Sequence, residues 1–135
     1  MDIYPPKKIK ITKIKNKGRG VVATEKILKD EVIEYFPLLI LREKDSVFIG
    51  NKKRSDTLYH YYLLQPEFKR DTILLGYGSL YNHSSDPNCE IDYPNNPKME
   101  HAFFRAIKDI EAGEEITFNY NFDDDLVEFL PAHKN

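Results

Sequence analysis

Residues 78–89 read Gly-Ser-Leu-Tyr-Asn-His-Ser-Ser-Asp-Pro-Asn-Cys, and this stretch decides how the rest of the chain is interpreted. An apolar run, Ile-Leu-Leu-Gly-Tyr at residues 73–77, leads directly into it. Polar groups beside a core cost about 1–3 kcal/mol each when they lack hydrogen-bond partners. The stretch is therefore either a self-bonded turn, which Ser-Asp-Pro-Asn favours, or a ligand site.

Length and composition fit one globular domain. The chain has 135 residues, of which 41% are apolar and 31% charged, as in soluble proteins with a single core. The longest apolar run, residues 36–41, is far too short to span a membrane, and the N-terminus lacks the apolar core of a signal peptide. Cys89 is the only cysteine, so we expect no disulfide framework, no cysteine-rich zinc cluster and no metal site.

Charge is unevenly distributed along the chain. The formal net charge is −2, which gives no overall attraction to nucleic acid. Residues 7–19 are basic and residues 109–128 are acidic. The acidic end, with Asp123-Asp124-Asp125, is suited to a cationic substrate, although a solvated acidic surface is the commoner outcome for such a run.

A short pattern occurs twice in the sequence. Its positions are Ala23, Ile27, Asp30-Glu31 and Ile33 in the first copy, and Ala106, Ile110, Gly113-Glu114 and Ile116 in the second. Each copy indicates the end of a strand, a tight turn and a new strand. The copies are too short to form a solenoid.

The remaining patterns favour strands over helices. Alternation and β-branched residues predict strands at 9–12, 21–23 and 32–41, the last broken by Pro37, and a hairpin with arms 89–93 and 101–105. A short helix is predicted over residues 57–64, after a surface loop at 42–55. Residues 123–135 either form one helical turn around Leu126 and Phe129 or stay mobile. We therefore expect a mainly β fold with few short helices.

Three motifs in this order resemble those of the SET-domain family of protein lysine methyltransferases. They are Lys17-Gly18-Arg19-Gly20-Val21, Asn82-His83-Ser84 with Asp86-Pro87-Asn88, and Gly113-Glu114-Glu115-Ile116 through Tyr120. The resemblance covers nearly the whole chain and implies small curved sheets and a C-terminal pseudoknot that places Asn82-His83 beside Tyr120. Lacking other cysteines, residues 1–135 resemble the minimal stand-alone SET proteins of viruses and bacteria, without zinc-binding flanking segments.

The resemblance also implies a reaction, the transfer of a methyl group from S-adenosylmethionine to a lysine amine of a protein. The expected cofactor-binding residues are Lys17, Gly18, Arg19, Gly20, Asn82 and His83. Tyr120 is the expected catalytic residue, because its hydroxyl would orient the lysine amine. Glycines at positions 18 and 20 suit a close approach of the backbone to a ligand.

The expected substrate channel contains Tyr62, Tyr81, Phe118 and Phe122. Tyr59 and Tyr61 are alternatives to Tyr62 for the tyrosine of the second motif. In the family, phenylalanine at the position of Phe118 leaves room for a methylated amine, so di- or trimethylation is expected to be permitted.

The expected partner is a protein with a target lysine, such as a histone tail, in the cytoplasm or in a host nucleus. We expect neither membrane association nor direct binding of nucleic acid, and a homodimer remains open because a small β domain exposes strand edges. Two alternatives remain: a SET-like binding module without activity, and a small nucleic-acid-binding domain that uses the lysines of residues 7–19. The latter region lacks interleaved aromatic residues for base stacking.

Overall fold

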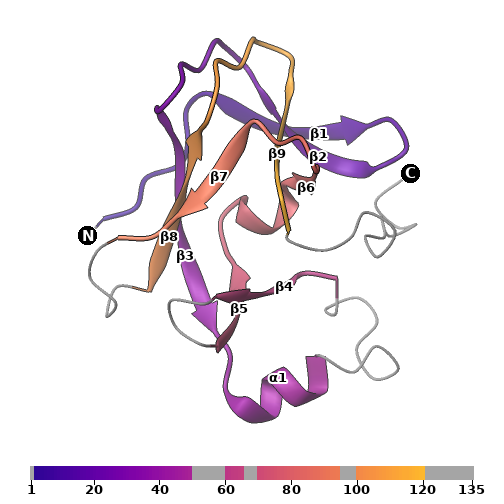
Figure 1. The fold of residues 1–135 in the computed structure, drawn as a ribbon, viewed down its shortest axis with the longest axis vertical. Coiled ribbons are helices and arrows are strands. Elements are labelled where there is room, and N and C mark those ends of the chain that lie inside the picture. The colour runs from indigo at the N-terminus through magenta and orange to yellow at the C-terminus, as the bar shows by residue number, and fades with distance from the viewer. Residues whose placement is uncertain (1, 50–59, 66–69, 95–99, 121–135) are drawn as a thin grey trace.

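The computed structural model describes residues 2–49, 60–65, 70–94 and 100–120. Within them the chain forms two β-sheets and little helix (Figure 1), which confirms the mainly β prediction. The strands are β1 (Ile9–Ile14), β2 (Gly18–Ala23), β3 (Val32–Ile40), β4 (Tyr62–Gln65), β5 (Arg70–Leu74), β6 (Asn82–His83), β7 (Cys89–Asp92), β8 (His101–Ala106) and β9 (Glu115–Phe118). One α-helix, α1 (Glu43–Ile49), and one turn of 3-10 helix, η1 (Gly78–Leu80), complete the described part.

The first sheet has four strands in the order β1-β2-β9-β6. β1 and β2 form a hairpin whose turn is closed by a hydrogen bond of 3.0 Å from the Lys17 amide to the Ile14 carbonyl. Asn16 and Gly18 adopt φ angles of 66° and 82° there, which suits residues that tolerate the left-handed region. β6 runs parallel to β9 at the edge of the sheet, so it brings residues 82–83 beside residues 117–118.

The second sheet has five strands in the order β4-β5-β3-β8-β7, with β3 at its centre. The expected hairpin is confirmed as β7 and β8. The expected break at Pro37 is wrong, because β3 continues to Ile40. Pro37 is the last residue of β3 to pair with β8, and Leu38 is the first to pair with β5. The missing N–H of the proline therefore falls where β3 changes partners.

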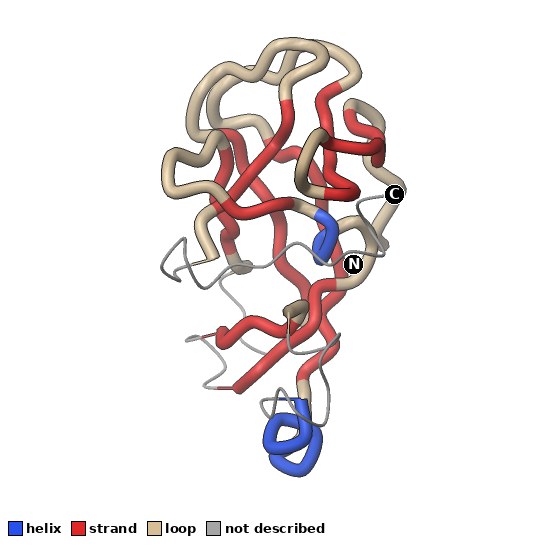
Figure 2. The backbone as a smooth tube through the Cα atoms, turned by 90° about the vertical axis from the view of Figure 1, so that its right-hand side faces the viewer, coloured by secondary structure: helices blue, strands red, loops and turns tan. Residues whose placement is uncertain are grey.

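The helix predicted over residues 57–64 is wrong where the structure describes it, since β4 begins at Tyr62. β4 pairs with β5, and this tertiary pairing overrides a weak local preference. The predicted loop at 42–55 instead contains α1, which starts with Glu43 and Asp45 in its first turn, where acidic side chains favour a helix. α1 lies at one end of the molecule, beyond β4 and β5 (Figure 2).

The two copies of the repeated sequence pattern lie against each other. Ile27 and Ile110, both fully buried, exchange two backbone hydrogen bonds of 2.8 Å. The Asp30 amide donates to the Ala106 carbonyl, and at the equivalent place the Gly113 amide donates to the Ala23 carbonyl, both at 2.8 Å. The copies thus bond reciprocally and join the two sheets.

One core lies between the sheets. Its aromatic centre is the buried ring of Phe104, whose centroid lies 4.2 Å from that of Tyr81, 4.8 Å from that of Phe118 and 5.0 Å from that of Phe36. The core thereby connects the five-stranded sheet to β9 and to the segment before β6. The expected pseudoknot depends on residues after 120, which lie outside the described residues, so it stays a prediction. In the described chain no helix has the length and apolar character needed to cross a membrane.

Candidate functional site

The candidate site lies where β9 ends beside β6. Pairing places Asn82 opposite Thr117 and His83 opposite Phe118. Two residues past β9, the Tyr120 amide donates a 3.0 Å hydrogen bond to His83 Nδ1, and the two rings lie 5.2 Å apart. The expected proximity of Asn82-His83 and Tyr120 is therefore observed.

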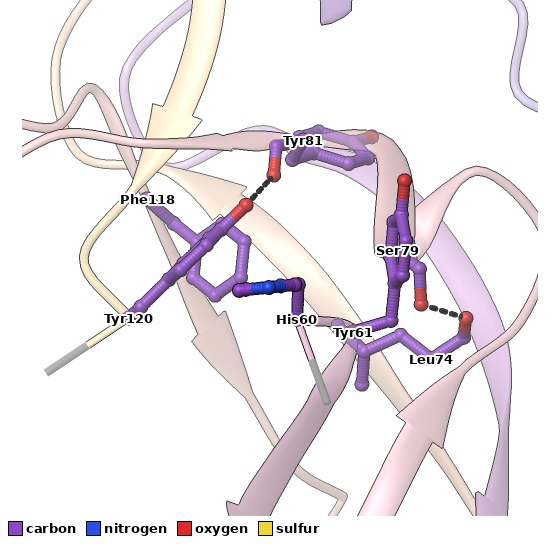
Figure 3. A pocket seen from close by; sticks show the side chains of 8 residues that line it. His60, Tyr61, Leu74, Ser79, Tyr81, Phe118 and Tyr120 are labelled. Atoms are coloured by element: carbon purple, nitrogen blue, oxygen red, sulfur yellow. Dashed lines mark hydrogen bonds between the residues drawn. The ribbon is translucent and has the colours of Figure 1, made fainter. Parts of the chain in front are cut away.

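The hydroxyl of Tyr120 points to a backbone carbonyl. It donates a hydrogen bond of 2.5 Å to the Tyr81 oxygen (Figure 3). The hydroxyl proton is thereby occupied, and the lone pairs of the oxygen are left to accept a hydrogen bond from a ligand. Burial raises the pKa of Tyr120, and the negative charge of Glu115 adds to the rise. The hydroxyl is therefore neutral at physiological pH.

A narrow pocket opens beside this hydroxyl. Its walls come from three parts of the chain: His60, Tyr61, Leu74, Gly78, Ser79, Tyr81, Phe118 and Tyr120. The open space is about 10 Å³, room for about one water molecule. Figure 3 shows His60 and Tyr61 opposite Phe118 and Tyr120. A slot lined mainly by aromatic rings suits a slim, flexible chain rather than a planar ligand.

Tyr81 contributes to this pocket through its backbone. Its side chain is almost fully buried, packs on Phe104 and donates from its hydroxyl to Glu34 Oε1 at 2.9 Å. Burial, followed by the charge of Glu34, raises the pKa of Tyr81 well above its usual value. The expectation that Tyr81 shapes the channel therefore takes a specific form, in which its carbonyl rather than its ring faces Tyr120.

A polar network lies on the other side of β6 and β9. Asn82 Nδ2 donates to the Arg19 carbonyl at 2.9 Å and to Glu115 Oε2 at 2.7 Å. Glu115 Oε1 pairs with Lys17 Nζ at 2.8 Å. Both N–H groups of the Asn82 amide are thus engaged, which orients its Oδ1 as an acceptor. The six expected cofactor residues are brought together here, since Lys17 to Gly20 lie on one side and Asn82 and His83 on the other.

Gly20 allows this network to form. A Cβ at this position would lie 2.7 Å from Asn82 Nδ2, 2.7 Å from Glu115 Oε2 and 2.5 Å from Ile14. Any side chain would therefore displace the amide and the carboxylate. The glycine is explained by this close approach, and its φ lies outside the left-handed region.

Asn88, from the polar stretch at residues 78–89, fixes the strand that leads to Tyr120. Its side chain donates to the Glu115 carbonyl at 2.8 Å and accepts from the Thr117 amide at 3.0 Å. A buried amide side chain thus acts as a strand neighbour for β9. The interpretation as a self-bonded turn holds in part, because the Ser84 hydroxyl accepts from the Asp86 amide at 3.0 Å. The interpretation as a ligand site stays a prediction.

The other expected channel residues are Phe118, Tyr62 and Phe122. Phe118 lines the pocket and stacks at 4.8 Å from the ring of Tyr120. Tyr62 lies in β4 and only its backbone is described, whereas Tyr61, one of its alternatives, lines the pocket. Phe122 and Tyr59 lie outside the described residues.

Sequence reasoning missed several residues of the site. Glu115 and Asn88 lie within the motifs but were not predicted as site residues, and His60 and Glu34 were not singled out. The one available signal was an acidic residue, Glu34, inside an apolar strand. Among residues 2–49, 60–65, 70–94 and 100–120, no group of three or more metal-ligating side chains is found.

Comparison with known proteins gives the family. Residues 18–121 match the SET domain. The chain belongs to the SET-domain family. The matched range of this SET domain includes Gly18 to Gly20, Asn82-His83 and Tyr120.

Named relatives are similar to this SET domain at about one third identity. An N-lysine methyltransferase of Xenopus laevis is 31% identical over 83% of the chain and 36% of its own length. A histone-lysine N-methyltransferase of Arabidopsis thaliana is 32% identical over 95% of the chain and 26% of its own length. The chain thus spans about a quarter to a third of the length of these relatives.

A solved structure shares the fold. A Plasmodium falciparum protein assigned as a histone methyltransferase matches with a TM-score of 0.62 and 30% identity, over 86% of this chain and 99% of the other.

Proposed function

We propose that this SET domain transfers a methyl group from S-adenosylmethionine to lysine side chains of proteins. The observation that carries the proposal is the meeting of the Tyr120 hydroxyl and the Tyr81 carbonyl at the end of an aromatic slot. The names of the relatives, an N-lysine and a histone-lysine methyltransferase, support the same reaction.

The residues of the polar network fit the cofactor. S-adenosylmethionine carries a cationic amine, and an oriented Asn82 Oδ1 beside the Glu115 carboxylate offers acceptors for it. When bound, the cofactor supplies an electrophilic methyl group on a positively charged sulfur. Lys17 neutralises part of the Glu115 charge, and the backbone of residues 18–20, kept open by glycine, would follow the cofactor closely.

The pocket favours the neutral form of the lysine amine that accepts the methyl group. A free lysine has a pKa of about 10.4, so only about one amine in a thousand is neutral near pH 7.4. Aromatic walls disfavour the charged ammonium relative to water and lower its pKa. The chain therefore needs no strong base, and the proton leaves to solvent before methyl transfer.

Tyr120 then orients the neutral amine. Its hydroxyl oxygen accepts an N–H of the lysine, while the bond to Tyr81 holds the hydroxyl in place. In-line displacement depends on alignment of the reacting atoms. The carbonyl of Tyr81 also offers an acceptor for weak C–H···O contacts to a polarised methyl group.

We further propose that Phe118 permits more than one methyl group and that the substrate is a basic segment such as a histone tail. Phe118 has no hydroxyl to occupy space beside the Tyr120 ring. The acidic triplet Asp123-Asp124-Asp125 would raise the encounter rate of a basic peptide. Tyr62 and Phe122 remain proposed channel residues.

Mass spectrometry tests the proposal. The chain is incubated with S-adenosylmethionine and either core histones or a cell lysate, and lysine modifications are mapped beside a Tyr120→Phe control. Mass gains of 14, 28 or 42 Da on defined lysines, absent in the control, are expected from one to three methyl groups at about 14 Da each. Absence of modification together with failure to bind the cofactor would instead favour a binding module without activity.

A further inference from the structure

β3 carries a buried carboxylate, Glu34, which is 3% exposed. The register of β3 against β8 shifts between Val32 and Glu34, so β3 holds one extra residue, Ile33, at this point. Glu34 shares the buried face of β3 with Phe36 and Leu38, whereas Tyr35 and Leu39 are exposed, as alternation along a strand requires. At the bulge Ile33 is buried as well. A carboxylate therefore stands in an otherwise apolar row of side chains.

Both oxygens of Glu34 bind the segment that precedes β6. Oε2 accepts from the Tyr77 amide at 2.9 Å, and Oε1 accepts from the Tyr81 hydroxyl at 2.9 Å. Gly76 lets the backbone close onto the carboxylate, because its φ is 62° and a Cβ there would lie 2.8 Å from Oε2. Burial raises the pKa of Glu34, and the two hydrogen bonds oppose that rise.

The bound segment forms one wall of the pocket. Gly78, Ser79 and Tyr81 line it, and the Tyr81 carbonyl accepts the hydrogen bond from Tyr120. The ring hydroxyl and the carbonyl are the two ends of the same residue. Fixing the Tyr81 hydroxyl in the core therefore limits where its carbonyl can point.

We propose that Glu34 is a positioning residue for the site. Through the Tyr77 amide and the Tyr81 hydroxyl it sets the place of the Tyr81 carbonyl, and through that carbonyl the orientation of the Tyr120 hydroxyl. The kinetic consequence rests on the proposed methyl transfer, whereas the orientation of Tyr120 does not.

The first test observes Tyr120 directly by nuclear magnetic resonance of protein labelled with carbon-13 at tyrosine Cζ. Loss of one resonance in Tyr120→Phe assigns it. Tyr81→Phe removes the hydroxyl and keeps the ring that packs on Phe104, Glu34→Gln removes the carboxylate charge, and Glu31→Gln is the control. Glu31 is also a hydrogen-bonded carboxylate, 2.8 Å from Lys8 Nζ, but at the surface.

The Tyr120 resonance is expected to move in Tyr81→Phe and in Glu34→Gln, and to stay in place in Glu31→Gln. The effect of the double variant is expected to fall short of the sum of the single effects, because both changes act on the hydrogen bond between Glu34 and the Tyr81 hydroxyl. An unmoved Tyr120 resonance in both single variants overturns the proposal. If Glu34→Gln does not fold, Tyr81→Phe alone decides.

The second test is kinetic, below the unfolding temperature of every variant. Tyr81→Phe is expected to lower kcat about tenfold and to leave the KM for S-adenosylmethionine within about twofold, because a small displacement of Tyr120 affects alignment and not cofactor binding. A fall in kcat that only follows the folded fraction contradicts the proposal.

The two tests separate this inference from the proposed function. If the Tyr120 resonance moves in the variants but the wild-type protein methylates nothing, the proposed methyl transfer is refuted and the positioning role of Glu34 is kept. Active variants with unmoved resonances would do the reverse.

Discussion

The two copies of the repeated pattern, residues 23–33 and 106–116, begin alike and end differently. They exchange reciprocal hydrogen bonds through Ile27 and Ile110. After the first copy, β3 joins the centre of the five-stranded sheet and carries Glu34 on its buried face. After the second copy, β9 joins the four-stranded sheet and leads to Tyr120. The local pattern decides the turn, and the partners of the following strand decide what that strand contributes to the site.

The partners of β9 make the difference. β2 lies on one side of β9, and β6 lies on the other. The side chain of Asn88 bonds to the backbone of β9 at two points. β9 therefore separates the polar network of Lys17, Asn82 and Glu115 from the aromatic pocket, and it contributes a residue to each.

The largest effect on activity is expected at Tyr120, which follows the second copy of the pattern and has no counterpart after the first. Tyr120→Phe is expected to lower kcat at least about 100-fold, because the lysine amine loses the acceptor that aligns it. Cofactor affinity is expected to stay within about twofold. Initial rates and calorimetric titration check this, with Tyr4→Phe, an exposed tyrosine, as the control. Near-normal kcat in Tyr120→Phe would remove Tyr120 from the reaction.

The pH dependence of kcat/KM tests the role of the pocket at the end of β9. The value of kcat/KM is expected to rise by up to tenfold per pH unit from about pH 7 to 9, as the neutral fraction of the free lysine rises. Burial raises the pKa of Tyr120, so its hydroxyl remains protonated over this range and causes no decline. A maximum below pH 8 in initial-rate profiles would mean that another group limits the reaction.

The polar side of β9 is tested at Glu115, the first residue of that strand. Glu115→Gln is expected to raise the dissociation constant for S-adenosylmethionine about tenfold, because charged hydrogen bonds contribute about 1.5–3 kcal/mol. The matched control is Glu114→Gln, since the Glu114 carboxylate is exposed and accepts from the Glu111 amide at 3.1 Å in a local turn. Equal affinities in calorimetric titration of the two variants would contradict the assignment.

Phe118→Tyr tests the aromatic side of the same strand. The added hydroxyl would lie near the ring of Tyr120, 4.8 Å away, and take space needed by a methylated amine. The product is expected to shift toward monomethyl-lysine with a smaller change in total turnover. Mass spectrometry of a peptide time course gives the distribution, and an unchanged distribution would show that other residues control the methyl count.

The smallest expected effect lies in the turns of the two copies. Asp30 and Gly113 occupy equivalent positions, with φ angles of 72° and 89°. A Cβ at Gly113 would meet nothing within 4 Å, so Gly113→Ala is expected to cost only the conformational penalty, about 1 kcal/mol. Gly113→Asp, which copies the first turn, is expected to cost less, because aspartate tolerates this region better. Urea unfolding checks the order, and equal losses would contradict it.

From the sequence alone, the strands and turns that depend on short-range patterns could be predicted. The hairpin of β7 and β8, the two turns of the repeat and the three motifs all depend on residues that are close together along the chain. The resemblance of the motifs to the SET-domain family also implied a site at Asn82-His83 and Tyr120, and the structure brings His83 and Tyr120 into contact. The sequence did not give the position of the helix. The local preference for helix at residues 57–64 is weak, and the pairing of β4 with β5 overrides it, whereas α1 forms at Glu43–Ile49.

Which side chains form hydrogen bonds with distant residues could be learned only from the tertiary structure. Glu34 lies on the buried face of β3 with Phe36 and Leu38, but its partners, the Tyr77 amide and the Tyr81 hydroxyl, are 43 and 47 residues away along the chain. Tyr81 serves through its carbonyl because its ring is held in the core by Glu34. The Asn82 amide has its orientation because Arg19 and Glu115, 63 and 33 residues away, converge on it. Such contacts depend on the relative placement of strands from two sheets, and that placement is set by packing around the shared core rather than by local sequence.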